Sequence, residues 1–295
     1  MRKITGVAKW QTVVMWLLLV LYAAARIFQQ YPDRFPMLLI VAMQVLPPGL
    51  FGLLHGSMRY GVRGMAVFAA CCLGVSATTE SLSLRTGFPF GHYVFTDVMG
   101  PKVMQLPVLL VLAYLGIGYC SWVLATLILG QRAVEGRWSL TIPLLASPIM
   151  VAWDVSMEAI WSTLDRAWIW RDGGYFFGVP ISNFLGWYLT AFLIFLAFAL
   201  YNRVYPFPAP KLPQSYWRAA IACYGICGFG NLLIYRQGLF PATAMDATGK
   251  VWTTMNILSA STLVSVLGMG SLVVLAWRRS SAVSTRAPAR SLIRS

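Results

Sequence analysis

Residues 147–187 read SPIMVAWDVSMEAIWSTLDRAWIWRDGGYFFGVPISNFLGW and place two carboxyl groups inside an apolar helical segment. At a rise of 1.5 Å per residue, a helix over 140–161 puts Asp154 roughly 5 Å and Glu158 roughly 11 Å from its midpoint, within a hydrocarbon layer about 30 Å thick. An acid facing lipid would cost about 2.5 to 3.5 kcal/mol, so such groups face a bundle interior. The sequence therefore predicts a functional site inside a membrane protein.

The spacing of this pair predicts how the two acids divide their roles. Positions i and i+4 are neighbours on a helix, so Asp154 and Glu158 share a face with Trp161, and Asp165 follows if the helix continues. Burial and a like-charged neighbour predict that one acid of the pair is protonated and the other ionised. That division suits a general acid and a general base.

The composition extends the membrane prediction to the whole chain. Of 295 residues, 58% are hydrophobic and 11% are charged. Apolar segments of this length and number indicate an all-α, polytopic transmembrane helical bundle of about eight spans. We expect one integral membrane domain over 1–277 and a basic, disordered cytoplasmic tail over 278–295. The predicted spans are 12–28, 37–54, 62–79, 107–129, 140–161, 183–204, 216–234 and 252–277.

The net charge of +14 fits a membrane protein better than a nucleic-acid-binding one. The lysines and arginines lie in short loops and near the termini, and most fall on one side when both termini are placed in the cytoplasm. We therefore expect a lipid bilayer and no nucleic acid as a partner.

Two outer loops are long, aromatic and punctuated by glycine and proline. They read TESLSLRTGFPFGHYVFTDVMGPK at 79–102 and STLDRAWIWRDGGYFFGVPIS at 162–182. Irregular backbone at membrane depth is tolerated only where protein or a cavity covers it. We expect both loops to fold back over the bundle as a lid or a re-entrant segment.

Candidate residues in and beside these loops each have an ordinary alternative. Glu80 ends the third span and is either a third functional acid or a helix-end glutamate facing water. His92, beside Tyr93, is more often a polar surface group than a ligand. The aromatic residues Trp161, Tyr175 and Phe177 either belong to the interfacial belt or line a slot for a long apolar ligand. Asn183 either caps the sixth span or orients a water molecule.

The small number of metal-binding side chains and the lack of nucleotide-binding and catalytic motifs exclude several enzyme classes. The chain has two histidines, His55 and His92, too few for a His-rich di-iron site, and its five cysteines fall within apolar spans as packing residues. It contains no GxGxxG after a strand, no P-loop and no GxSxG elbow. We therefore predict no metal and no cofactor.

Three motifs together resemble the membrane carotenoid hydratase family. They are Glu80 with TGFPFGHYVFTDVMGPK, then AWDVSMEAIWS, then RDGGYFFGVPISNFLGW. This family includes γ-carotene 1′-hydroxylases and bisanhydrobacterioruberin hydratases, and the resemblance is dense from Glu80 to Trp187. It implies cofactor-independent hydration of the terminal isoprenoid double bond of an acyclic or monocyclic carotenoid in a bacterial or archaeal cytoplasmic membrane, beside other carotenoid biosynthesis enzymes.

The leading hypothesis is therefore a carotenoid 1,2-hydratase in which protonated Asp154 delivers a proton and Glu158 or Glu80 activates water. A proton-coupled transporter or lipid carrier that uses the same acids as a relay is the alternative, although the chain shows no paired halves. A non-catalytic scaffold for carotenoid enzymes is a third possibility.

Overall fold

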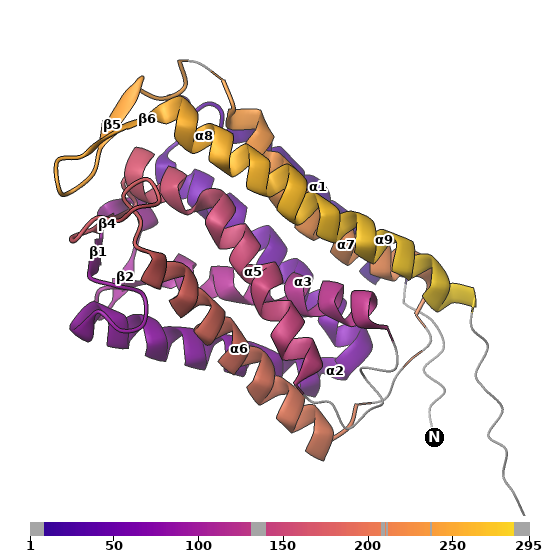
Figure 1. Ribbon diagram of the computed structural model, residues 1–295. Helices are drawn as coiled ribbons and strands as arrows, with labels where there is room; N and C mark the ends of the chain where they lie inside the picture. Colours follow the sequence, from indigo (N-terminus) through magenta and orange to yellow (C-terminus); the bar gives the residue numbers. More distant parts are fainter. Residues whose placement is uncertain (1–8, 131–139, 208–209, 211, 237, 286–295) are drawn as a thin grey trace, which may run out of the picture.

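The computed structural model describes residues 9–130, 140–207, 210, 212–236 and 238–285. Its long helices run roughly lengthwise along one bundle, and short strands gather at one end (Figure 1). The helices are α1 Lys9–Phe28, α2 Met37–Thr86, α3 Val108–Leu129, α5 Thr141–Ala159, α6 Ile181–Val204, α7 Gln214–Gly230, α8 Thr254–Leu263 and α9 Gly270–Thr285.

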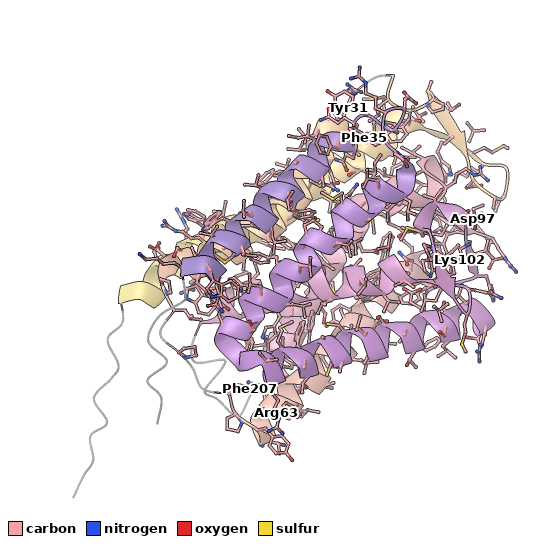
Figure 2. All side chains as sticks on the ribbon, turned by 180° about the vertical axis from the view of Figure 1, so that it is seen from behind. Tyr31, Phe35, Arg63, Asp97, Lys102 and Phe207 are labelled. Carbon is pink, nitrogen blue, oxygen red and sulfur yellow. The ribbon has the colours of Figure 1, made fainter. Side chains whose placement is uncertain are left out.

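Seven helical segments among the described residues are long and apolar enough to cross a membrane. With 50 residues and a break inside it, α2 is long enough for two crossings. Its backbone leaves helical geometry at Gly61, with φ 69° and ψ 172°, a conformation that glycine adopts readily. Figure 2 shows the result: α2 starts beside Phe35 at one end of the bundle, turns near Arg63 at the other, and returns. The prediction of an all-α bundle with about eight spans is confirmed.

α3 is the central helix and packs against both arms of α2, which are residues 37–60 (the first arm) and 62–86 (the second arm). Its most apolar window is 72% buried, the highest share of the seven segments. Gly116 permits close contact with the first arm, because a Cβ there would lie 3.0 Å from the backbone nitrogen of Gly49. The second arm and α5 also pack against α3, so α3 provides the wall against which buried side chains of its neighbours gather.

The two long outer loops form one cap. Strand β1 (Tyr93–Phe95) in the first loop pairs antiparallel with β4 (Trp168–Trp170) in the second, with Tyr93 opposite Trp170. The cap lies at the end of the bundle opposite the start of α1 and the end of α9 (Figure 1). Both loops therefore fold over the end of the bundle, and the strand pair β1–β4 joins them. The remaining short elements are η1 Asp97–Met99, β2 Lys102–Val103, β3 Leu106–Pro107, η2 Ile160–Leu164, η3 Asn231–Ile234, β5 Thr243–Met245, β6 Val251–Thr253 and η4 Val264–Met269.

Large apolar side chains cover the outer surface of the bundle. Val20 of α1 is 64% exposed and Leu267 of η4 is 65% exposed, and many similar residues surround them. A surface of this kind is stable in lipid and not in water, so the protein is an integral membrane protein. At the C-terminal end, α9 continues to Thr285, so residues 278–285 of the expected disordered tail are helical. Residues 286–295 of that tail lie outside the described residues.

A buried carboxylate cluster beside an apolar cavity

Glu158 is held by two indole groups of the cap. It lies near the end of α5 and is 2% exposed. Its Oε1 atom accepts hydrogen bonds from Trp168 Nε1 at 2.6 Å and from Trp170 Nε1 at 2.8 Å. Alternate residues of a strand point to the same side, so β4 aims both tryptophans at one acceptor. The strand pairing thus fixes the surroundings of Glu158.

Glu80 lies in the second arm of α2 and accepts hydrogen bonds from two tyrosines of other elements. Tyr114 of α3 donates its hydroxyl to Oε1 at 2.6 Å, and Tyr93 of β1 donates to Oε2. The Tyr93 ring lies 4.8 Å from that of Trp170, between centroids, so the donors to Glu80 and Glu158 are in contact. Glu80 is 4% exposed and does not face water as an ordinary helix-end glutamate would.

Asp154 is the most deeply buried of the three acids, with no exposed surface. Its Oδ2 atom accepts a hydrogen bond from Asn183 Nδ2 at 3.0 Å. Its Oδ1 atom has no hydrogen-bond partner among the described residues. The amide of Asn183 therefore hydrogen-bonds to Asp154 and does not cap α6, which begins at Ile181 without a side-chain cap.

Electrostatic interactions join the three acids into one cluster. Asp154 interacts with both Glu158 and Glu80, and Glu158 interacts with Glu80. Within the described ranges, the two ion pairs are His92 with Asp172 and Lys102 with Asp97, so no cation neutralises the cluster. Three buried carboxyl groups without a basic partner are costly for folding, and such groups are retained where they have a function.

Trp161 lines a cavity together with Trp153 and Met157, which precede it at helical spacing. The helix widens to π geometry over Ile160–Leu164, where Asp165 N bonds to the carbonyl five residues earlier at 2.9 Å. The residue count of an α-helix therefore does not carry through this turn to Asp165.

The other predicted binding residues lie away from the acids. Tyr175 is 91% exposed. The side chain of His92 is 60% exposed and contacts Asp172 through Nδ1 at 2.7 Å. Phe177 packs its ring against Trp252 of β6, with centroids 5.5 Å apart. Of the six predicted binding residues, Tyr93 and Asn183 therefore contact the acid cluster directly.

Sequence reasoning missed Tyr114, which completes the surroundings of Glu80. Its ring stacks on Trp187 of α6, with centroids 4.3 Å apart and planes inclined by 4°. Trp187 in turn meets Trp153 edge to face at 5.5 Å. A fully buried tyrosine hydroxyl in an apolar helix needs a polar partner, and this was the one signal available in the sequence.

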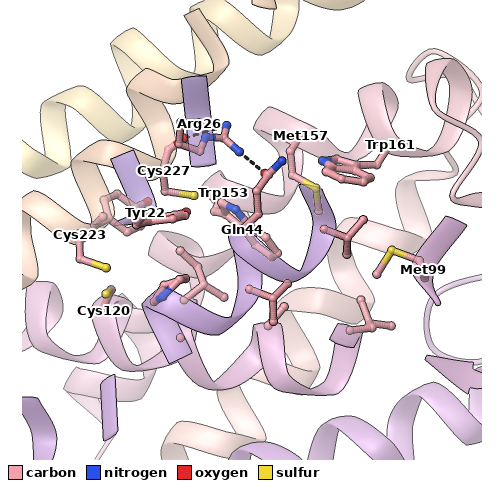
Figure 3. A pocket seen from close by; sticks show the side chains of 18 of the residues that line it. Tyr22, Arg26, Gln44, Met99, Cys120, Trp153, Met157, Trp161, Cys223 and Cys227 are labelled. Atoms are coloured by element: carbon pink, nitrogen blue, oxygen red, sulfur yellow. Dashed lines mark hydrogen bonds between the residues drawn. The ribbon is translucent and has the colours of Figure 1, made fainter. Parts of the chain in front are cut away.

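A cavity of about 780 Å³ lies next to the cluster, and we call it the large cavity (Figure 3). Trp168 lines it and also bonds to Glu158, while Trp153 lines it and neighbours Asp154 in the chain. Trp168 therefore joins the wall of the large cavity to the acid cluster, and none of the three acids lines that cavity. Its lining is mostly apolar.

A second cavity of about 480 Å³, the outer cavity, shares Gln44, Met157 and Trp161 with the large cavity. Asp165 lines it just beyond the membrane-spanning part of α5 and η2. Burial raises the pKa of the Asp165 carboxyl from 3.8 to about 7. In the part of the chain that the structure describes, no group of three His, Cys, Asp or Glu side chains is arranged to hold a metal ion.

The fold and this site define a polytopic helical membrane protein with a capped cluster of acids beside a cavity of mostly apolar lining. Residues 34–245 match the family of carotenoid biosynthesis proteins, which is more than half of the chain. The chain therefore belongs to that family and has a role in carotenoid biosynthesis. Neither a curated protein nor a solved structure matches it.

Proposed function

We propose that the protein adds water across the terminal isoprenoid double bond of a carotenoid and forms a tertiary alcohol. The observation that carries the proposal is the unpartnered Oδ1 atom of Asp154 inside a cluster of three buried carboxyl groups. The family membership supports a carotenoid as the ligand class. The apolar lining of the large cavity next to the cluster also suits a polyene.

In the proposed reaction, Asp154 is the general acid. Its Oδ1–H proton moves to the less substituted carbon of the double bond, and the other carbon becomes a tertiary cation. The oxygen of a water molecule then bonds to that cation, and the proton that the water loses passes to Glu158. Proton return from Glu158 to Asp154 restores the site, so alkene and water give alcohol without any redox change.

The two glutamates are arranged as bases rather than acids in this scheme. Glu158 accepts two N–H bonds and Glu80 accepts two O–H bonds, and donors of this kind stabilise ionised carboxylates. Their negative charge also favours a developing cation nearby. The rings of Trp168 and Trp170 add cation–π stabilisation of about 0.5 to 2 kcal/mol each where they face the cation.

Access to the acids requires a movement in the cavity wall, because none of the three acids lines the large cavity. The proposal includes movement of the Trp168 ring, which lines the cavity and bonds to Glu158, when the polyene end enters. An apolar lining also keeps bulk water away from the cation.

The test is conversion of an acyclic carotenoid by membranes that contain the protein, in isotopically labelled water. We expect a more polar product that carries the label, with Asp154→Asn membranes as the inactive control. Label arriving from dioxygen instead would assign the protein to the oxygen-dependent hydroxylases. An unchanged pigment profile with wild-type protein present would favour the transporter or the scaffold.

A further inference from the structure

A buried arginine forms part of the wall of the large cavity. Arg26 lies in the last turn of α1 and is 6% exposed. Its Nη1 donates to Gln44 Oε1, and its Nη2 donates to Asn231 Oδ1 and, at 3.3 Å, to the carbonyl of Cys227. The bond from Arg26 to Gln44 crosses the cavity wall in Figure 3. The Nε atom has no partner among the described residues.

The positive charge of Arg26 is uncompensated in the described structure. All three of its acceptors are neutral, and the two described ion pairs involve other residues. A guanidinium group does not lose its proton in a protein, so the charge stays. An isolated buried charge is costly unless a ligand or partner interacts with it.

Gln44 extends this polar wall with a free donor. Its Oε1 atom is occupied by Arg26, which leaves the Nε2 amide group without a described partner while the side chain lines both cavities. The amide of Asn231 differs, because it already donates to Ser156 and Ser265 at 3.0 Å each. Arg26 and Gln44 together therefore offer the cavity positive charge and N–H donors.

We propose that Arg26 and Gln44 bind a hydroxyl or carbonyl oxygen carried by the polyene ligand. The ligand class in this statement rests on the proposed function. An oxygen acceptor fits a wall of donors, whereas a hydrocarbon would leave the Gln44 amide unpaired in an apolar cavity. A hydrogen bond assisted by a charged group contributes about 1.5 to 3 kcal/mol, which corresponds to a preference of about 10- to 150-fold.

Electrostatics separates this oxygen from the reacting double bond. A tertiary cation next to the Arg26 guanidinium would be repelled, whereas one next to Glu158 would be stabilised. Trp168, which bonds to Glu158, and Arg26 line the same cavity.

The deciding variant is Gln44→Glu, which keeps an acceptor for Arg26 Nη1, removes the free amide donor and neutralises the charge. Binding of two matched polyenes, lycopene and its derivative with one terminal hydroxyl group, is measured by quenching of tryptophan fluorescence in lipid nanodiscs. Trp153, Trp161 and Trp168 line the cavity and report on occupancy. The readout is the ratio of the two dissociation constants, which cancels differences in lipid partitioning common to all variants.

Wild-type protein should favour the hydroxylated polyene at least about tenfold, and Gln44→Glu should abolish this preference while thermal stability holds or rises. Gln30→Glu makes the same change just beyond α1, at a side chain outside both cavity linings, and should keep the preference. Arg26→Gln should also lose it. A wild-type protein without the preference, or a Gln44→Glu protein that retains it, would overturn the proposal. Every protein in this binding measurement also carries Asp154→Asn, so that lycopene is not converted into its hydroxylated derivative during the titration. Hydration by the wild-type protein can therefore fail while this preference holds, and the reverse.

Discussion

Replacing Asp154 by asparagine changes the buried cluster without changing its shape. Asn183 can still donate to the remaining oxygen at the position now 3.0 Å away, and the new amide nitrogen takes the place of the unpartnered Oδ1 atom. That nitrogen can donate to a neighbouring carboxylate, whereas the wild-type oxygen has no described partner. The free energy of unfolding should therefore hold or rise, by up to about 1 to 3 kcal/mol.

Activity should move in the opposite direction, because an amide has no proton to give. General acid catalysis contributes about 10² to 10⁴-fold, which corresponds to about 3 to 5 kcal/mol of transition-state stabilisation. The assay compares conversion of an acyclic carotenoid in membranes containing equal amounts of wild-type and Asp154→Asn protein. Thermal unfolding of both purified proteins in the same detergent is measured in parallel.

Two results would refute this reasoning. Near wild-type conversion by Asp154→Asn would remove the residue as the general acid. A loss of conversion that accompanies a clear fall in melting temperature would assign Asp154 a structural role. Glu158→Gln and Glu80→Gln, measured beside it, rank the two bases, since the more damaging substitution marks the carboxylate that takes the proton from water.

Three other predictions test separate parts of the structure. Because the folded-state pKa of Asp165 is raised from 3.8 to about 7, its stabilising contribution is complete below about pH 4 and is lost as the pH rises through 7. Asp165→Asn should flatten the dependence of melting temperature on pH between about pH 4 and 7, where the wild-type protein loses at most about 4 kcal/mol of unfolding free energy through this group. An unchanged slope of melting temperature against pH would contradict the raised pKa of Asp165. Gly186→Ala should lower the melting temperature, because a Cβ would lie 2.6 Å from a ring carbon of the first outer loop, whereas Gly74→Ala has open space and should raise it slightly. Equal changes in melting temperature for Gly186→Ala and Gly74→Ala would show that the first outer loop moves to accommodate the added Cβ. Trp168→Phe keeps a ring at the cavity wall but removes one donor to Glu158, so conversion should fall about tenfold, and full conversion would show that the indole N–H is dispensable.

The sequence alone determined the membrane class and the identity of the acids. Hydropathy reports the cost of burying each residue in lipid, a local property that a window of about twenty residues captures. The eight crossings follow from it, including the two arms of α2 that Gly61 joins. The positions of Asp154, Glu158 and Glu80 in or near apolar spans marked them in the same way, because each is costly wherever it faces lipid.

The tertiary structure decided which residues surround those acids. Trp168 reaches Glu158 only because β4 pairs with β1, and that pairing joins loops more than seventy residues apart in the chain. Tyr114 reaches Glu80 only because α3 packs against the second arm of α2. Neither contact has a local signal in the sequence, since each depends on which helices become neighbours.

Local backbone geometry decided where individual side chains near the acids lie. The π turn at Ile160–Leu164 interrupts the regular helix at Trp161, whose ring lines the large cavity. The loop histidine His92 and the exposed Tyr175 lie outside the cluster, although their sequence neighbours belong to it. Periodicity assumes regular helices and says nothing about irregular loops. The sequence therefore identified the acids, whereas the packing of helices and the pairing of two loops determined their partners, because those contacts join residues that are distant in the chain.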